Sequence, residues 1–218
     1  MQTPATAQTI TPPAEPEPSK VHGRWRPRIV PAVRDVDLES AEDAARLLLG
    51  ALGLDLTDES LVRTPRRMAR ALAEMTSAPE FELTTFPNDG GYDEMVLVEN
   101  IPVRSLCEHH MLPFVGVAHV GYLPGERILG LSKFARMVEF HSRRPQTQER
   151  LTKQIADHLG ELLEPHGVGV VVEAEHTCMS IRGARAQGAR TVTSALHGRF
   201  REDPASRAEF LALAKGRL

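Results

Sequence analysis

The sequence predicts an α+β fold. This prediction rests on the order of the helical and extended patterns, in a chain with the composition of a globular protein. Helical periodicity comes first, two extended runs follow, and two helical segments precede further extended runs. This grouping differs from the regular alternation of strand and helix that marks a parallel α/β sheet. Hydrophobic residues make up 41% and charged residues 25% of the 218 residues, which is ordinary for a globular protein with a sizeable core.

Charge, apolar runs and cysteine content exclude several classes of protein. The net charge is −3, from 26 Lys and Arg against 29 Asp and Glu, which argues against a nucleic-acid or membrane-surface binder. No apolar run approaches the ~20 residues that span a bilayer, and the N-terminus lacks the apolar core of a signal peptide. Two cysteines are too few for a disulfide framework and favour a reducing, cytoplasmic compartment.

Three regions are expected along the chain. Residues 1–33 hold seven of the 16 prolines and few large apolar residues, so a disordered tail is expected there. Residues 34–94 carry the first helical patterns. Residues 95–218 carry the extended runs and the later helices, and form the expected main domain.

The N-terminal patterns predict two helices and a loop. A helix is predicted from about Asp37 to Gly53, because alanine and leucine recur there at helical spacing and glycine ends the pattern. Thr64-Pro65 predicts the start of a second helix, since threonine caps helices and proline is favoured in the first turn. Ser77 to Asp93, rich in proline, glycine and asparagine, is predicted as a loop.

The main domain is predicted to contain four strands and three helices. The predicted strands are Met95–Val103, Val115–Tyr122, Gly167–Glu175 and Thr191–Leu196. The predicted helices run from Leu131 to His141, after Pro145 as far as Leu163, and from Asp203-Pro204 onward.

Both cysteines lie next to histidines, which predicts a metal site. Cys107 and His110 are three residues apart and face one side of a turn, and Cys178 adds a third ligand. Thiolate and imidazole are the ligands that zinc prefers, and three protein ligands leave a fourth position for water, as in catalytic sites. Two alternatives stay open on the pattern alone, namely unrelated buried side chains and a redox pair of cysteines.

Two further histidines, His109 and His176, adjoin the expected ligands. A histidine beside an activated water can exchange protons near pH 7, which favours a general acid or base. The alternative is a histidine that only orients a ligand or lies on the surface.

Positive charge gathers in the second half of the chain. Seven basic and two acidic residues lie between Arg127 and Lys153. Ser132 would lie at a helix N-terminus, where free backbone N–H groups favour phosphate, with Lys133 and Arg136 on one helix face. This arrangement suits a polyphosphate, and the alternative is an ordinary solvated helix face.

Gln148 and Glu149 follow at the start of the next predicted helix. Side by side, an amide and a carboxylate have the donors and acceptors to bind the edge of a purine. The alternative is common helix-surface composition.

Together these segments resemble the GTP cyclohydrolase I family, over roughly residues 36–215 and in order and spacing. The resemblance rests on Arg63–Arg67, Tyr92–Val96, Cys107–His110, Gly130–Lys133, Gln148–Thr152, His176–Met179, Arg182-Gly183, Thr191–Ser194 and Phe200–Pro204.

The resemblance implies a fold, a reaction and an assembly. The fold is the tunnelling fold (T-fold), an antiparallel sheet with helices on one face and an N-terminal helical extension, with residues 95–218 as the catalytic domain. The reaction converts GTP and water to 7,8-dihydroneopterin triphosphate and formate, the first step of pterin and tetrahydrofolate biosynthesis. The assembly is a cytoplasmic homodecamer of two pentamers, in which neighbouring subunits share each site.

The resemblance also implies roles for individual residues. Zinc, one ion per subunit, is bound by Cys107, His110 and Cys178, and the catalytic histidines are His109 and His176. The substrate-binding residues are Gln148 and Glu149 near guanine, and Ser132, Lys133, Arg136, Arg182 and Arg67 around the ribose and triphosphate.

Two other functions remain as alternatives. One is a different purine or pterin enzyme of the same fold. The other is a non-catalytic nucleotide-binding or redox-sensing protein, in which Cys107 and Cys178 form a reversible disulfide when metal is lost.

Overall fold

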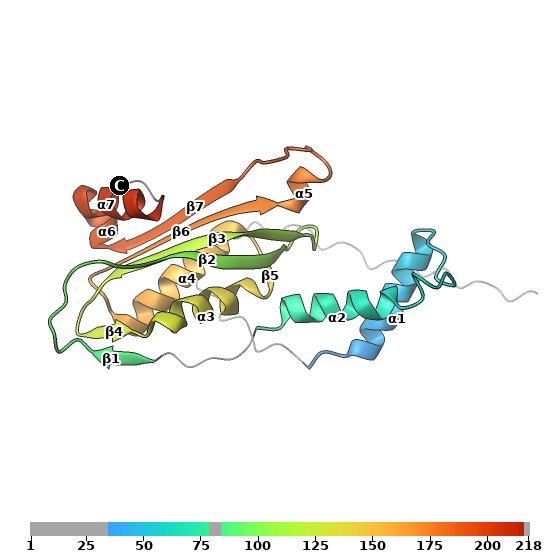
Figure 1. Ribbon diagram of the computed structural model, residues 1–218, viewed down its shortest axis with the longest axis horizontal. Helices are drawn as coiled ribbons and strands as arrows, with labels where there is room; N and C mark the ends of the chain where they lie inside the picture. Colours follow the sequence, from blue (N-terminus) through green and yellow to red (C-terminus); the bar gives the residue numbers. More distant parts are fainter. Residues whose placement is uncertain (1–34, 79–83, 216–218) are drawn as a thin grey trace, which may run out of the picture. The chain divides into compact units, whose positions relative to one another are not determined.

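The computed structural model describes residues 35–78 and 84–215, and it confirms the α+β class (Figure 1). The tail predicted at residues 1–33 lies outside the described residues. The helices are α1 (Leu38–Ala51), α2 (Thr64–Thr76), α3 (Leu131–Ser142), α4 (Gln148–Leu163), α5 (Thr177–Ser180), α6 (Arg199–Glu202) and α7 (Pro204–Ala214). The strands are β1 (Thr85–Pro87), β2 (Val96–Cys107), β3 (Pro113–Leu123), β4 (Arg127–Leu129), β5 (Pro145–Gln146), β6 (Gly167–His176) and β7 (Thr191–Gly198).

Helices α1 and α2 begin where the sequence predicts. The Asp37 side chain accepts a hydrogen bond from the Ser40 backbone N–H and caps α1. Pro65 lies in the first turn of α2, where its missing N–H costs no helical hydrogen bond. Ala45 and Leu49 are the buried residues of α1, and α1 packs on α2.

The main sheet has five strands in the order β5-β2-β3-β6-β7. Its four long strands pair antiparallel, as the family resemblance implies, and β5 adds two residues parallel to the end of β2. Strands β1 and β4 form a separate pair, so the prediction of an uninterrupted loop from Ser77 to Asp93 is wrong at Thr85–Pro87. A three-residue strand paired with residues far along the chain leaves no periodicity for sequence reasoning to detect.

Helices cover both faces of the sheet, which corrects the expectation of helices on one face. On one face Val170 and Val172 of β6 join the core beneath α3 and α4. On the other face Val171 belongs to a smaller cluster with Phe210 of α7. A Cβ atom at Gly169 would lie 2.6 Å from the Phe210 ring, so glycine at this position allows α7 to pack closely on the sheet.

The two ends of the sheet hold different groups. At one end, which we call the Cys107 end, β2 finishes at Cys107 and Phe114 of β3 pairs with His176 of β6. At the other, the Tyr122 end, the Tyr122 hydroxyl accepts a hydrogen bond from Leu129 N, just before α3. Phe114 and Tyr122 are eight residues apart on β3, so the two ends are separated by about 26 Å at ~3.3 Å per residue.

Candidate metal centre

A tight turn after β2 carries Cys107 and His110. The backbone N–H groups of His110 and Met111 donate to Cys107 O, and Cys107 N donates to Leu112 O at 2.8 Å. Met111 has a positive φ of 53°, which allows the chain to reverse direction into β3. The turn leaves the Cys107 side chain buried and the His110 side chain exposed.

Cys178 comes from helix α5, directly after β6. Thr177 Oγ1 donates to Pro113 O at 2.6 Å and fixes the start of α5 against the start of β3. The antiparallel pairing of β3 with β6 therefore brings Cys178 to the Cys107 turn, although the two cysteines are 71 positions apart (178 − 107).

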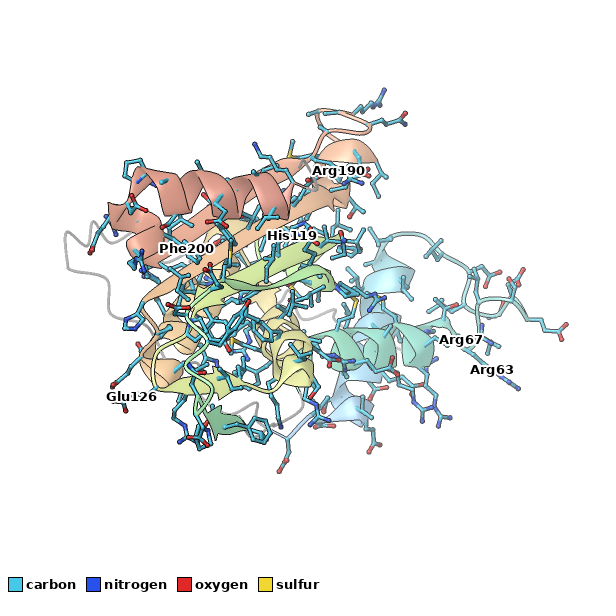
Figure 2. The ribbon with its side chains drawn as sticks, turned by 60° about the vertical axis from the view of Figure 1, so that its left-hand side comes forward. Arg63, Arg67, His119, Glu126, Arg190 and Phe200 are labelled. Carbon is cyan, nitrogen blue, oxygen red and sulfur yellow. The ribbon has the colours of Figure 1, made fainter. Side chains whose placement is uncertain are left out.

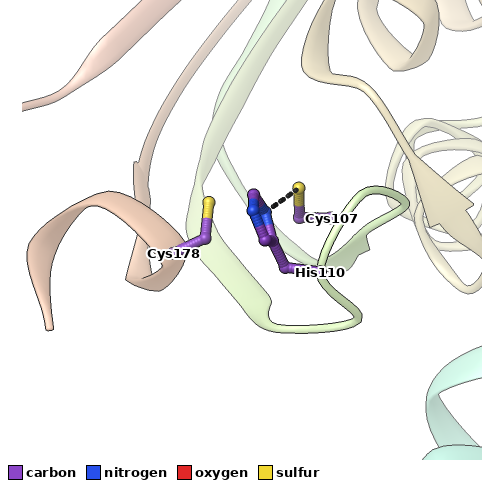
Figure 3. Close-up of side chains that lie close together, drawn as sticks. All are labelled: Cys107, His110 and Cys178. Atoms are coloured by element: carbon purple, nitrogen blue, oxygen red, sulfur yellow. Dashed lines mark hydrogen bonds between the residues drawn. The ribbon is translucent and has the colours of Figure 1, made fainter. Parts of the chain in front are cut away.

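The three predicted ligands converge (Figure 3). Their ligand atoms lie within 4.8 Å of one another, and Cys107 Sγ is 3.8 Å from His110 Nδ1. Ligand atoms at zinc's usual bond lengths would lie roughly 3.3–3.8 Å apart in a tetrahedron, so the donor set fits a zinc ion with little movement. Burial and the neighbouring Cys107 thiol raise the pKa of the Cys178 thiol, whereas Arg182 lowers it.

Both predicted catalytic histidines lie next to these ligands. His109 Nδ1 is 3.8 Å from Cys107 Sγ, and the His109 ring is exposed. His176 stacks on Phe114, with ring centroids 4.5 Å apart and an interplanar angle of 12°. Burial lowers the pKa of His176, and the nearby Glu149 carboxylate opposes that effect.

The structure separates the environments of Gln148 and Glu149. Glu149 is exposed and lines a hollow of about 550 Å³ beside β7, together with Lys153, His197, Arg201 and Arg207. Gln148 is 2% exposed, and its amide is hydrogen-bonded to groups within the chain. Glu149 therefore has the open position that a base contact needs.

Arg150 and Glu108 form an ion pair that sequence reasoning missed. The Arg150 guanidinium binds the Glu108 carboxylate, donates to Gln146 Oε1 at 2.7 Å and to Pro145 O at 2.9 Å. Glu108 N donates to Gln146 O. Side-chain and backbone contacts therefore both join β5 to the turn that carries Cys107 and His110, which we call the ligand turn. No spacing in the sequence indicated this pair, because Glu108 and Arg150 belong to segments far apart in the chain.

The predicted triphosphate residues do not gather at the Cys107 end. Ser132 and Lys133 lie in the first turn of α3, which begins at the Tyr122 end, and Arg136 lies one turn further along α3. Arg182 is exposed and close enough to Cys178 to lower its pKa. Arg67 is exposed on α2 (Figure 2). Among these residues, Arg182 is the one whose charge acts on Cys178 within one chain.

The side chains that converge at the Cys107 end define the class of site. Two cysteines and one histidine converge, two further histidines adjoin them, and three protein ligands leave one coordination position open. An open position distinguishes catalytic from structural zinc centres. The fold and the converging side chains are thus those of an α+β protein with a candidate catalytic metal centre.

Comparison with known proteins gives the particular family. The GTP cyclohydrolase I family model matches residues 41–215. GTP cyclohydrolase 1 of Streptomyces avermitilis is 54% identical over 191 residues, covering 85% of this chain and 94% of that protein. GTP cyclohydrolase 1 of Aquifex aeolicus is 51% identical over 181 residues, covering 83% and 98% respectively. This chain belongs to the GTP cyclohydrolase I family and is an enzyme.

No helix among the described residues is long and apolar enough to cross a membrane.

Proposed function

We propose that this chain is a zinc-dependent GTP cyclohydrolase I that converts GTP and water to 7,8-dihydroneopterin triphosphate and formate. One observation carries the proposal. Cys107, His110 and Cys178 lie within 4.8 Å of one another beside His109 and His176, in a chain matched by the family model over residues 41–215. The product would enter pterin and tetrahydrofolate biosynthesis.

The donor set supports zinc at this centre. Two thiolates and an imidazole are ligands that zinc prefers over hard, oxygen-seeking cations. When bound, zinc supplies a Lewis acid that makes water available for hydrolysis at neutral pH.

The two histidines move protons during the reaction. His109 protonates N7 of the purine as the imidazole ring opens, which its exposed position beside Cys107 permits. His176 exchanges protons near the ribose, and its stacking on Phe114 restricts the orientation of its ring. A second hydrolytic step releases C8 as formate.

Substrate binding is assigned to side chains that take no part in making or breaking bonds. Glu149 anchors guanine from the hollow beside β7 by accepting hydrogen bonds from the base. Ser132, Lys133, Arg136, Arg182 and Arg67 bind the ribose and triphosphate. Their binding energy orients the purine C8 toward the Cys107 end.

The separation of these groups supports a homo-oligomer. Lys133 lies in the first turn of α3, which begins at the Tyr122 end, whereas the candidate metal ligands lie at the Cys107 end of the sheet. We therefore assign the two halves of each substrate site to neighbouring copies of the chain.

The edges of the sheet offer a route to such an assembly. Among the described residues, β7 is the last strand of its sheet, and β5 covers the outer edge of β2 only at Leu106 and Cys107. Strands β2 and β7 run in opposite directions, so β2 of one copy can extend the sheet antiparallel to β7 of another. Repetition of this contact closes a ring, as in the proposed T-fold decamer of two pentamers.

The test is a GTP turnover assay on the full chain. Purified protein is incubated with GTP before and after chelator treatment, and formate and the near-ultraviolet pterin chromophore are measured together. Both products should appear, vanish with the metal and return when zinc is added. Formation of neither product by a zinc-loaded oligomer would overturn the proposal, whereas nucleotide binding without turnover would favour the non-catalytic alternative.

A further inference from the structure

Gln148 has a closed set of partners at the Cys107 end. Its Nε2 lies 3.0 Å from Val172 O, 2.9 Å from Thr191 O and 3.2 Å from Thr193 Oγ1. Its Oε1 lies 2.8 Å from Nε2 of His176. The side chain is 2% exposed, so these contacts, rather than solvent, determine how the amide is oriented.

The partners fix which amide atom faces which group. Val172 O and Thr191 O are backbone carbonyl oxygens, which only accept hydrogen bonds, so the NH₂ group must face them. The opposite orientation would place Oε1 against two carbonyl oxygens, all acceptors, inside the protein. Oε1 therefore faces His176.

We propose that Gln148 is a positioning residue that holds His176 in the neutral tautomer with its proton on Nε2. A carbonyl oxygen accepts and cannot donate, so Nε2 of His176 must carry the hydrogen of the 2.8 Å contact. In a neutral imidazole the other nitrogen, Nδ1, then holds the lone pair. Nδ1 is thus the nitrogen through which His176 exchanges a proton with substrate.

Two neighbouring contacts make this orientation rigid. Stacking on Phe114 sets the plane of the His176 ring, and Gln148 sets its rotation within that plane. The same amide joins helix α4 to strands β6 and β7 through Val172 and Thr191. The inference rests on the proposed function for the identity of the proton transfer, but the tautomer itself is a property of the enzyme without substrate.

The first experiment measures the tautomer directly. The zinc-loaded full chain, with ¹⁵N-labelled histidine, is examined by NMR without GTP, at a pH above the pKa of imidazole. The signals of His176 are identified by their loss in His176→Asn. A protonated Nε2 and an unprotonated Nδ1 are expected, and the reverse pattern would overturn the proposal whether or not the chain acts on GTP.

The second experiment separates positioning from structural support. Gln148→Met keeps the volume and removes both hydrogen-bonding groups, and Thr193→Val removes one partner of Gln148 but leaves the contact with His176. Gln148→Met should give mixed His176 tautomers and a kcat reduced about 100-fold, with a KM for GTP changed by less than about threefold. Thr193→Val should keep the single tautomer and most of the activity.

A double-mutant cycle gives the decisive kinetic outcome. If Gln148 acts through His176, Gln148→Met should cost little further kcat in the His176→Asn background. An undiminished loss there, or a reduced kcat with the wild-type tautomer retained, would assign Gln148 a merely structural role and overturn the proposal. Should Gln148→Met not fold, the tautomer of the unmodified chain still decides.

Discussion

The Cys107 end and the Tyr122 end of the sheet supply different parts of the proposed substrate site. At the Cys107 end, hydrogen bonds within one chain fix the surroundings of the metal ligands, through Thr177, Gln148 and Arg150. At the Tyr122 end, α3 begins at Leu131 without a side-chain cap, and Ser132 and Arg136 are exposed.

This difference teaches that reactive and binding groups need different degrees of fixation. A metal centre needs its ligands within a few tenths of an ångström, and buried hydrogen bonds provide that order before substrate arrives. In the proposed site, the side chains that bind the triphosphate are ordered further when the phosphates and a neighbouring copy contact them. In the proposed enzyme, one chain supplies the candidate metal ligands, and a neighbouring copy completes the groups that bind the phosphates.

The largest expected effect comes from removing a metal ligand at the Cys107 end. Cys178→Ser replaces a soft thiolate with a poor zinc ligand, so zinc should be lost and turnover should fall below detection. Zinc content by mass spectrometry and formate release measure the two effects. Met179→Ala, at an exposed neighbour on α5, is the matched control and should keep both. Full activity of Cys178→Ser without zinc would remove the metal from the proposal.

The next effect tests the Tyr122 end. Lys133→Ala should raise the KM for GTP by about 10- to 100-fold and change kcat little, since one charge-assisted contact to phosphate contributes ~1.5–3 kcal/mol. Steady-state kinetics measure both constants. Arg127→Ala removes an exposed cation from β4 at the same end and should leave KM nearly unchanged.

Mixing the two variants tests whether the ends of different chains meet. Cys178→Ser and Lys133→Ala subunits, dissociated and reassembled together, should regain activity at low GTP. About a quarter of the sites would then combine two intact halves, because each half is intact in half of the copies. Activity no higher than the sum of the separate variants would assign both halves to one chain.

The candidate ligands could be predicted from the sequence because thiol and imidazole side chains lie close together along it. Cys107 and His110 share one turn, and thiolate with imidazole suggests zinc wherever it occurs. Spacing could not show that Cys178 joins them, since that depends on the β3–β6 register. Cys178 was expected as a ligand on its chemistry alone, and the family resemblance decided between His109 and His110.

Other features were invisible because two unrelated segments create them. Three such features depend on tertiary contacts. They are the pairing of β1 with β4, the packing of Phe210 on Gly169 and the Arg150–Glu108 ion pair. The burial of Gln148 likewise follows from the packing of α4 on β6 and β7, whereas its sequence neighbour Glu149 stays exposed. Their adjacency, and then the family resemblance, predicted one role near guanine for both residues.

A smaller effect is expected where Arg150 supports the ligand turn. Arg150→Met keeps the aliphatic stem and removes the contacts to Glu108, Gln146 and Pro145, so zinc affinity should fall about 10- to 100-fold. Competition with a chelator measures that affinity. Arg46→Met breaks a comparable but exposed pair with Glu42 on α1 and should change nothing. Equal zinc affinity in both variants would show that the ligand turn needs no support from α4.

The smallest effect concerns stability beside the Cys107 end. His141 of α3 is buried against His158, with Nε2 to Nδ1 at 2.9 Å, and its carbonyl accepts from Gln146. Burial, and then the charges of His158 and Arg144, lower the pKa of His141 to about 3. In the unfolded chain the same ring titrates near 6.5, the usual value for histidine.

The sign of the pH dependence follows from this depressed pKa. Above about 6.5 the ring is neutral in both states, and no stability is lost. As the pH falls from 6.5 toward 3, the unfolded chain binds a proton that the folded chain does not. The free energy of unfolding therefore falls by up to about 1.4 kcal/mol per pH unit.

His141→Gln should flatten this dependence between pH 6.5 and 5, as urea unfolding at each pH would show. The exposed His166→Gln is the control and should keep the wild-type slope. An unchanged slope in His141→Gln would mean that acid weakens the protein elsewhere, for instance at the proposed contacts between copies. The same titration at several protein concentrations separates these causes, because only assembly depends on concentration.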